Sequence, residues 1–230
     1  VELLLDKKSK DPNFTVIDVG GSMGSWSSSV ADAYVDINAP INNPLGCKLF
    51  QADLTNPFTW DELLDYVEKN GKFSFSICTH TLEDISHPEL TIYLLEKISN
   101  EGYIAVPSKY REMSNVEGME YRGYIHHRWI CNIRNNVFTL FPKINYLERS
   151  DIANKIGCID NRIFDLNFFW KGKIHYKVIN NGYLGPSIDA VKYYYEDLLN
   201  DDMDKKYNIK IVNGELFYDI KIVNGKITLP

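Results

Sequence analysis

The sequence has 230 residues, a formal net charge of -6 and an isoelectric point of about 5.4. Hydrophobic residues make up 44% and charged residues 24%, a balance typical of a globular domain rather than a disordered chain. The acidic surplus disfavours nucleic acid as a partner, because proteins that neutralise phosphates usually carry a basic surplus. No apolar run approaches the roughly 20 residues that cross a bilayer, and no basic-then-apolar leader opens the sequence, so we expect no membrane partner.

The cysteines are scattered along the chain and form no CxxC pair. Such thiols fit a reducing cytoplasm better than a disulfide framework or a zinc site. We therefore expect a cytoplasmic protein without structural disulfides. The four residues are Cys47, Cys78, Cys131 and Cys158.

Strands and helices alternate in the first part of the chain. Residues 14–19, FTVIDV, are apolar and β-branched and stop at Gly20-Gly21, which predicts a buried strand. Further strands are predicted at 33–38, 47–53, 73–78 and 103–108. The intervening segments predict helices, and this alternation is typical of an α/β fold with a parallel, doubly wound sheet.

Three helices are predicted between these strands. A short one is expected over about residues 25–32. Two longer ones are expected to begin at capping boxes, Thr59 with Glu62 and Ser86 with Glu89. They are expected to end near Asn70-Gly71 and Ile98, respectively.

The chain changes character after residue 108. Residues 109–180 are rich in aromatic residues, Arg and Asn, with strand-like pieces at 136–141 and 173–179, and 189–199 predicts a helix. The hexapeptide Ile-Lys-Ile-Val-Asn-Gly occurs at 209–214 and again at 220–225, which predicts a small antiparallel meander. We interpret 1–108 as a core and 109–230 as the remainder of the same domain, with a cap over about 109–180.

The segment VIDVGGSMGSW, residues 16–26, has the form of a ligand-binding turn. A strand that enters a helix through glycines exposes backbone N–H groups and the positive end of the helix dipole. Asp18 stands at the strand end, and the glycines let the backbone approach a ligand. Asp36 and Asp53 follow the next two strands, and the crevice outside the carboxyl ends of such strands is where ligands bind.

The segment after the fourth strand resembles a known family. Residues 73–88, FSFSICTHTLEDISHP, resemble the class I S-adenosylmethionine-dependent methyltransferases, particularly the small-molecule branch, which carry a His-x-Leu-Glu-His/Asp segment there. Residues 100–108, NEGYIAVPS, look like the family's turn and fifth strand. The resemblance covers about residues 14–108 and implies a Rossmann-like core. GGSMG does not satisfy the dinucleotide pattern G-x-G-x-x-G, so a nicotinamide cofactor is disfavoured.

The resemblance implies S-adenosyl-L-methionine as cofactor and assigns its contacts by position. The glycine turn would surround the methionine part, Asp36 would bind the ribose hydroxyls, and Asp53 with Leu54 would hold the adenine. Thr79 and His80 would line the floor under the methyl group. The turn residues concerned are Asp18, Gly20, Gly21, Ser22 and Gly24.

Three positions depart from the family pattern. Ser22 replaces the middle glycine of the turn, Ser74 replaces an acid near the start of the fourth strand, and Glu101 replaces a glycine. These departures leave open a catalytically silent methyltransferase-like domain that serves in binding or as a scaffold.

The stretch Tyr121-Arg-Gly-Tyr-Ile-His-His-Arg-Trp129 is the candidate acceptor site. A hydroxyl acceptor usually needs a base, and one of His126 and His127 is the candidate, because adjacent residues of an extended segment point to opposite sides. The same cluster also fits a loop packed on a sheet. Arg122 and Arg128 are expected to pair with an anionic group of the substrate, and Tyr124 and Trp129 to stack on a ring.

A metal site is the less favoured alternative. It would gather His80, Glu83, Asp84 and one of the two histidines, but no spacing fixes that geometry, and Glu83-Asp84 are expected to cap the next helix. We therefore expect methyl transfer without a metal to a small polar acceptor, at a hydroxyl of a sugar or sugar-linked metabolite. The sequence leaves the oligomeric state open.

Overall fold

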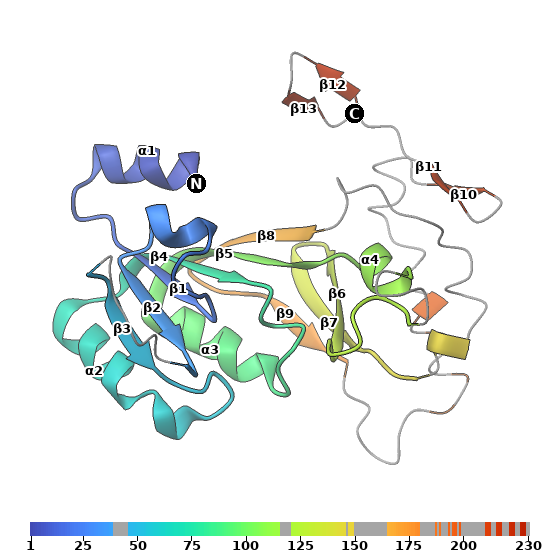
Figure 1. Ribbon diagram of the computed structural model, residues 1–230, viewed down its shortest axis with the longest axis horizontal. Helices are drawn as coiled ribbons and strands as arrows, with labels where there is room; N and C mark the ends of the chain where they lie inside the picture. The colour runs from blue at the N-terminus through green and yellow to red at the C-terminus, as the bar shows by residue number, and fades with distance from the viewer. Residues whose placement is uncertain are drawn as a thin grey trace. The chain divides into compact units, whose positions relative to one another are not determined.

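The computed structural model describes two compact units, 1–106 with 167–174 and 107–166 with 175–230 (Figure 1). Each unit is described by itself. The residues described are 1–38, 46–115, 121–145, 147–149, 165–179, six separate positions (187, 189, 193, 195, 196 and 198) and the backbone of four strands between 210 and 228. Cys158 and most of the helix expected over 189–199 lie outside these residues.

The first unit is built on a six-stranded sheet in the order β3-β2-β1-β4-β5-β8. The pairs β1–β2, β2–β3, β1–β4 and β4–β5 are all parallel. Because the order reverses at β1, the sheet is doubly wound and the predicted α/β fold class is confirmed. The strands are β1 (Val16–Val19), β2 (Ala33–Asp36), β3 (Lys48–Gln51), β4 (Phe73–Thr79), β5 (Ser99–Pro107) and β8 (Asp165–Lys171).

Helices cover both faces of this sheet (Figure 1). Helix α1 (Glu2–Lys10), which the sequence pattern did not predict, packs Leu4 against Val16 and Phe75 in a buried cluster. Helices α2 (Asp61–Asn70) and α3 (Pro88–Ile98) contact each other on the opposite face. Helix α3 buries an apolar stripe that includes Ile92, Leu95 and Ile98, as its periodicity predicts.

The predicted helix starts are wrong in detail. The Thr59 hydroxyl does not cap α2; it donates to carbonyls in the preceding turn, and a short 3-10 helix, η2 (Pro57–Thr59), precedes α2. Helix α3 begins at Pro88 after His87, so neither Ser86 nor the Glu83-Asp84 pair caps it. The helix expected over 25–32 is a four-residue 3-10 turn, η1 (Trp26–Ser29). The turns that precede these helices, and not the capping-box residues of the sequence, therefore determine where the helices begin.

The second unit contains a three-stranded sheet in the order β6-β7-β9. Strands β6 and β7 are antiparallel and are joined through Asn135 and Asn136, both with positive φ, as a tight hairpin turn requires. Strand β9 pairs with β7 in parallel. The elements are α4 (Lys109–Met113), β6 (Trp129–Arg134), β7 (Val137–Pro142), η3 (Leu147–Arg149) and β9 (Tyr176–Val178).

The described parts of the two repeats, residues 210–212 and 221–223, each form one strand of a separate antiparallel pair, β10 with β11 and β12 with β13. Their bounds are Lys210–Val212, Glu215–Phe217, Lys221–Val223 and Lys226–Thr228. Among the helices described, none has the length and apolar character needed to cross a membrane.

Candidate functional site

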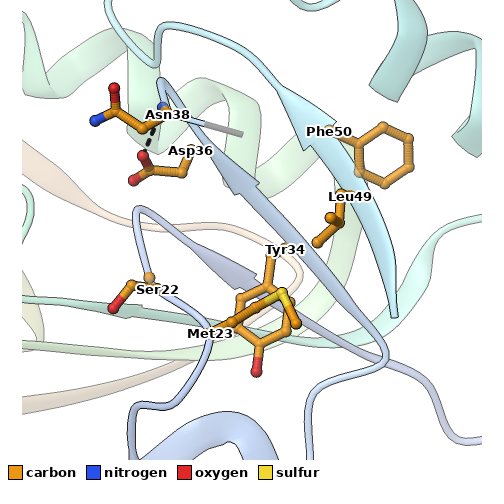
Figure 2. A pocket seen from close by; sticks show the side chains of 8 residues that line it. Ser22, Met23, Tyr34, Asp36, Asn38, Leu49 and Phe50 are labelled. Atoms are coloured by element: carbon orange, nitrogen blue, oxygen red, sulfur yellow. Dashed lines mark hydrogen bonds between the residues drawn. The ribbon is translucent and has the colours of Figure 1, made fainter. Parts of the chain in front are cut away.

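A pocket of about 230 Å³ opens beside the glycine turn that follows β1 (Figure 2). Its walls come from that turn, from β2 with the residues just after it, and from β3. Three of the predicted cofactor residues, Gly21, Ser22 and Asp36, line it. The remaining lining residues, which the sequence pattern did not single out, are Met23, Tyr34, Asn38, Leu49 and Phe50.

The turn after β1 is tied to the sheet by backbone contacts. The Gly20 N–H donates to the Val35 carbonyl at 2.8 Å, and Gly20 has a φ of 74°. Ser22 is exposed and is not among the described non-glycine residues with positive φ, so a serine is accommodated there without backbone strain. The departure from glycine at Ser22 is therefore compatible with the shape of the turn.

Asp18 lies beneath the turn rather than in the pocket wall. Its side chain is buried, one carboxylate oxygen accepts a hydrogen bond from the Ser27 hydroxyl, and the other has no hydrogen-bond partner. Burial raises the pKa of Asp18 to about 6, against the lowering effect of Ser27 and with a smaller raising effect from the charge of Asp36. A Cβ on Gly21 would stand 2.2 Å from the Asp18 carboxyl, so only glycine fits over this acid.

Asp36 presents a carboxylate at the carboxyl end of β2, inside the pocket wall. One oxygen accepts the Asn38 N–H at 2.8 Å, as the dashed line in Figure 2 shows. A carboxylate accepts several hydrogen bonds, so this contact leaves acceptor capacity for two hydroxyl donors.

Asp53 and Leu54 are placed in the turn after β3. One Asp53 carboxylate oxygen accepts from the Thr55 N–H at 2.8 Å and from the Thr55 hydroxyl at 2.7 Å. Leu54 is buried, and its carbonyl accepts from Thr91 of α3. Neither lines the pocket described above; the apolar side chains that face it are Met23 and Leu49, whereas the Phe50 ring is buried against Tyr66 of α2.

Thr79 and His80 stand at the carboxyl end of β4. His80 has a φ of 52°, an unusual backbone conformation for a residue other than glycine, and its side chain is 54% exposed. Its Nδ1 lies 3.4 Å from the buried Glu83 carboxylate. A Cβ on Gly20 would stand 2.5 Å from the Thr81 hydroxyl, so the turns after β1 and β4 are in close contact.

The other two departures from the family pattern have structural roles. Ser74 and Thr15 exchange hydrogen bonds between side chains and backbone N–H groups, at 3.2 and 3.3 Å, where β1 and β4 begin. This is the end of the sheet opposite to the pocket. Glu101 pairs with Lys7 of α1. Neither position therefore bears on the pocket.

The candidate acceptor residues lie in the second unit, in a segment that is not extended. The His127 N–H donates to the Tyr124 carbonyl at 3.2 Å, and this turn brings the rings of His126 and His127 into edge contact, with centroids 4.4 Å apart. The opposite orientation of the two histidines was expected for an extended segment, and that condition is not met here. His126 is exposed, whereas His127 is buried.

The other acceptor candidates have contacts within the same unit. Tyr124 accepts a hydrogen bond from Arg111, whose guanidinium also lies 4.9 Å from the tyrosine ring centre. The Arg122 backbone N–H donates to Glu148 at 3.0 Å. Arg128 is exposed, and Trp129 is the half-buried first residue of β6.

Glu112 of α4 is a residue that the sequence pattern did not reveal. It is buried, and its two carboxylate oxygens contact His127 Nδ1 at 2.6 Å and Lys143 Nζ at 2.8 Å. Helix α4 has five residues, which is too short to show a helical periodicity. A Ser108 cap is the only sign of it in the sequence: the Ser108 hydroxyl accepts from the Arg111 N–H.

Comparisons with known proteins identify no family. No protein-family model and no curated protein matches the sequence. One similar solved structure is an S-adenosylmethionine dependent methyltransferase from Mesorhizobium loti. The alignment covers 58% of this chain and 58% of that protein, with 14% sequence identity and a TM-score of 0.31. The chain thus spans a little over half the length of that protein.

Two structures of the N-terminal domain of EvdMO1 are also similar. One was determined in the presence of SAH and D-fucose, and it matches 86% of this chain and 71% of its own at 10% identity and a TM-score of 0.32. The other has SAH bound, with 10% identity, coverage of 86% and 69% and a TM-score of 0.32. Scores this low assign neither family, cofactor nor substrate, so those conclusions depend on the residues of this chain.

Proposed function

We propose that the chain is an S-adenosylmethionine-dependent methyltransferase that acts on a small polar molecule, at a hydroxyl oxygen of a sugar or sugar-linked metabolite. The pocket beside the glycine turn is the observation that carries the proposal. It combines a carboxylate suited to a ribose diol, Asp36, with a glycine turn whose Gly21 and Ser22 line the same pocket. The family resemblance of residues 14–108 supplies the identity of the cofactor.

The chemistry of the lining residues fits the parts of this cofactor. Asp36 would accept hydrogen bonds from the ribose hydroxyls, and Met23 and Leu49 would pack against the adenine. Asp53 and Leu54 stay the proposed contacts of the adenine edge, because Thr55 engages only one Asp53 oxygen. Gly20, Ser22 and Gly24, with the buried Asp18 below them, would shape the site for the methionine part.

The cofactor, when bound, supplies an electrophilic methyl group on a sulfonium. In-line transfer of such a group depends mainly on alignment and on exclusion of water. A hydroxyl acceptor also needs its proton removed, which a base accelerates by about 10²–10⁴-fold. His127 is the proposed base; Arg122, Arg128, Tyr124 and Trp129 are proposed as acceptor contacts.

Calorimetric titration with S-adenosylmethionine and S-adenosylhomocysteine tests the cofactor proposal. We expect both to bind the wild-type chain. The variant Asp36→Ala should weaken binding by about 10- to 100-fold, since two hydrogen bonds to a carboxylate are lost. The exposed Asp61→Asn on α2 removes the same charge elsewhere and should bind as the wild type does. Absence of binding at ligand concentrations of about 1 mM would refute the cofactor proposal.

The acceptor class is tested by methyl transfer to D-glucose, D-fucose and UDP-glucose, measured as S-adenosylhomocysteine release. His127→Ala should lower turnover by about 10²-fold or more, and His126→Ala should have a smaller effect. Full turnover in both variants, with cofactor binding intact, would show that neither histidine is the base.

A silent binding domain is the alternative function. Cofactor binding without transfer to any acceptor in this panel would support it. Since Ser22 is free of backbone strain and Ser74 joins the starts of β1 and β4, the departures that suggested lost activity are compatible with a working site.

A further inference from the structure

We infer that Glu112 is the positioning residue of His127: its carboxylate fixes the imidazole with the proton on Nδ1, so that Nε2 is the nitrogen that takes a proton. The use of Nε2 in catalysis rests on the proposed methyl transfer, whereas the tautomer itself does not. All the contacts in question lie within the second unit.

The direction of the hydrogen bond follows from the chemistry of the pair. His127 Nδ1 and a Glu112 oxygen are 2.6 Å apart, and the two side chains are 7% and 1% exposed. An ionised carboxylate can only accept hydrogen bonds, so Nδ1 must be the donor. In neutral imidazole the other nitrogen, Nε2, is then the acceptor, which is the state a general base requires.

Lys143 is the cationic partner of the Glu112 carboxylate. Its ammonium contacts the second Glu112 oxygen at 2.8 Å, and its side chain is 8% exposed. The same ammonium donates to the Tyr124 carbonyl at 2.6 Å, so Lys143 also holds the segment that carries His127.

Gly123 allows this segment to lie directly on α4. A Cβ at Gly123 would stand 2.5 Å from a Glu112 carboxylate oxygen and 2.7 Å from its Cα. Its φ of 58° also favours glycine, and its N–H donates to the Ser114 carbonyl at 2.6 Å. The approach that brings His127 to Glu112 therefore depends on a residue without a side chain.

Nitrogen-15 NMR of histidine-labelled protein tests the inference directly. We expect neutral His127, assigned by its loss in His127→Gln, to be the Nδ1–H tautomer in the wild type. A neutral His127 with its proton on Nε2 would overturn the inference. This measurement needs no substrate and no substitution at Glu112.

The variant Glu112→Gln should reverse the tautomer. Lys143 requires an acceptor, so the amide oxygen should face Lys143 and the amide NH₂ should face His127 Nδ1 and donate to it. The proton of His127 would then move to Nε2. An unchanged tautomer in a folded Glu112→Gln protein would contradict the inference. Glu148→Gln, which removes an exposed carboxylate that contacts Arg122 and not His127, is the matched control and should leave the tautomer unchanged.

Measurements of kcat and KM distinguish a role of Glu112 in positioning His127 from a role in fold stability alone. With any acceptor of the panel that is methylated, Glu112→Gln should lower kcat by about 10²-fold or more while the KM values for cofactor and acceptor change by no more than about threefold. Glu112→Asp keeps the carboxylate and should recover part of kcat. A parallel rise of KM with unchanged kcat would contradict the role. Lack of cofactor binding in the wild type would refute the proposed function and leave the tautomer result standing.

Discussion

At the scale of single residues, two buried acids have different surroundings and different consequences. Glu112 is matched by a cation and a ring nitrogen, so both of its oxygens are used. Asp18 has one oxygen on Ser27 and one without a hydrogen-bond partner. Burial without full pairing disfavours the charged form, which is why the pKa of Asp18 is raised to about 6.

The raised pKa of Asp18 predicts a dependence of stability on pH. Because the folded-state pKa lies above the ordinary aspartate value of 3.8, Asp18 contributes stability that is fully present below about pH 3.8 and is lost as the pH rises through about 6. From pH 5 to pH 8 this loss amounts to about 1 kcal/mol. Asp18→Asn cannot ionise, so its free energy of unfolding should fall less over that interval.

Urea unfolding at pH 5 and pH 8 measures this difference. For each protein, the free energy of unfolding at pH 8 is subtracted from that at pH 5. This difference does not contain the part of the substitution's effect on stability that is independent of pH. The exposed Asp61→Asn should retain the pH dependence of the wild type. An identical pH dependence in Asp18→Asn and the wild type would show that Asp18 titrates normally.

Single residues also mark where sequence patterns stop being informative. Asp36 could be selected because it ends a strand in a region where strand ends meet, and it does line the pocket. Asp53 carries the same pattern but does not line this pocket, and Thr55 two residues later engages one oxygen of its carboxylate in a local turn. Glu112 and His127 are 15 positions apart, and only the tertiary structure brings them together.

At the scale of elements, the central strands were predictable and the helix starts were not. Strands β1 and β4 are buried on both faces, so their apolar runs are continuous and easily recognised. The starts of α2 and α3 depend instead on turns formed by Pro57 and Pro88, which displaced the expected caps. Helix α1 has a polar composition with one buried residue, Leu4, so its pattern carried little information.

The glycine turn after β1 is the element whose shape matters most for the proposed site. Gly21→Ala would place a Cβ 2.2 Å from the Asp18 carboxyl, so the turn or the acid must move. We expect the affinity for S-adenosylmethionine to fall by at least about tenfold, together with the thermal midpoint. Titration calorimetry and thermal unfolding measure the two effects.

Gly71→Ala is the matched control for the turn. It makes the same substitution at the end of α2, where a Cβ would meet nothing within 4 Å; its φ of 84° disfavours alanine, so the thermal midpoint should fall without any change near the pocket. Its affinity for the cofactor should equal that of the wild type. If Gly21→Ala also binds with wild-type affinity, the turn does not contribute to the cofactor site.

At the scale of the whole molecule, the chain consists of a parallel-sheet unit with a pocket and a second unit with a buried Glu–His–Lys cluster. The alternation of strands and helices made β1 to β5 predictable, whereas α1 and β8 of the same unit were not predicted. The second unit was predicted only as short strands and a polar aromatic segment, because its cluster depends on contacts between α4, the 121–128 segment and Lys143.

A crystal structure of the chain with S-adenosylhomocysteine tests the central claim most directly. We predict ligand density in the pocket, with the ribose hydroxyls within hydrogen-bond distance of the Asp36 carboxylate and the adenine against Met23 and Leu49. Soaking at concentrations well above the measured dissociation constant ensures occupancy. A ligand bound elsewhere, with no contact to Asp36, would contradict the account.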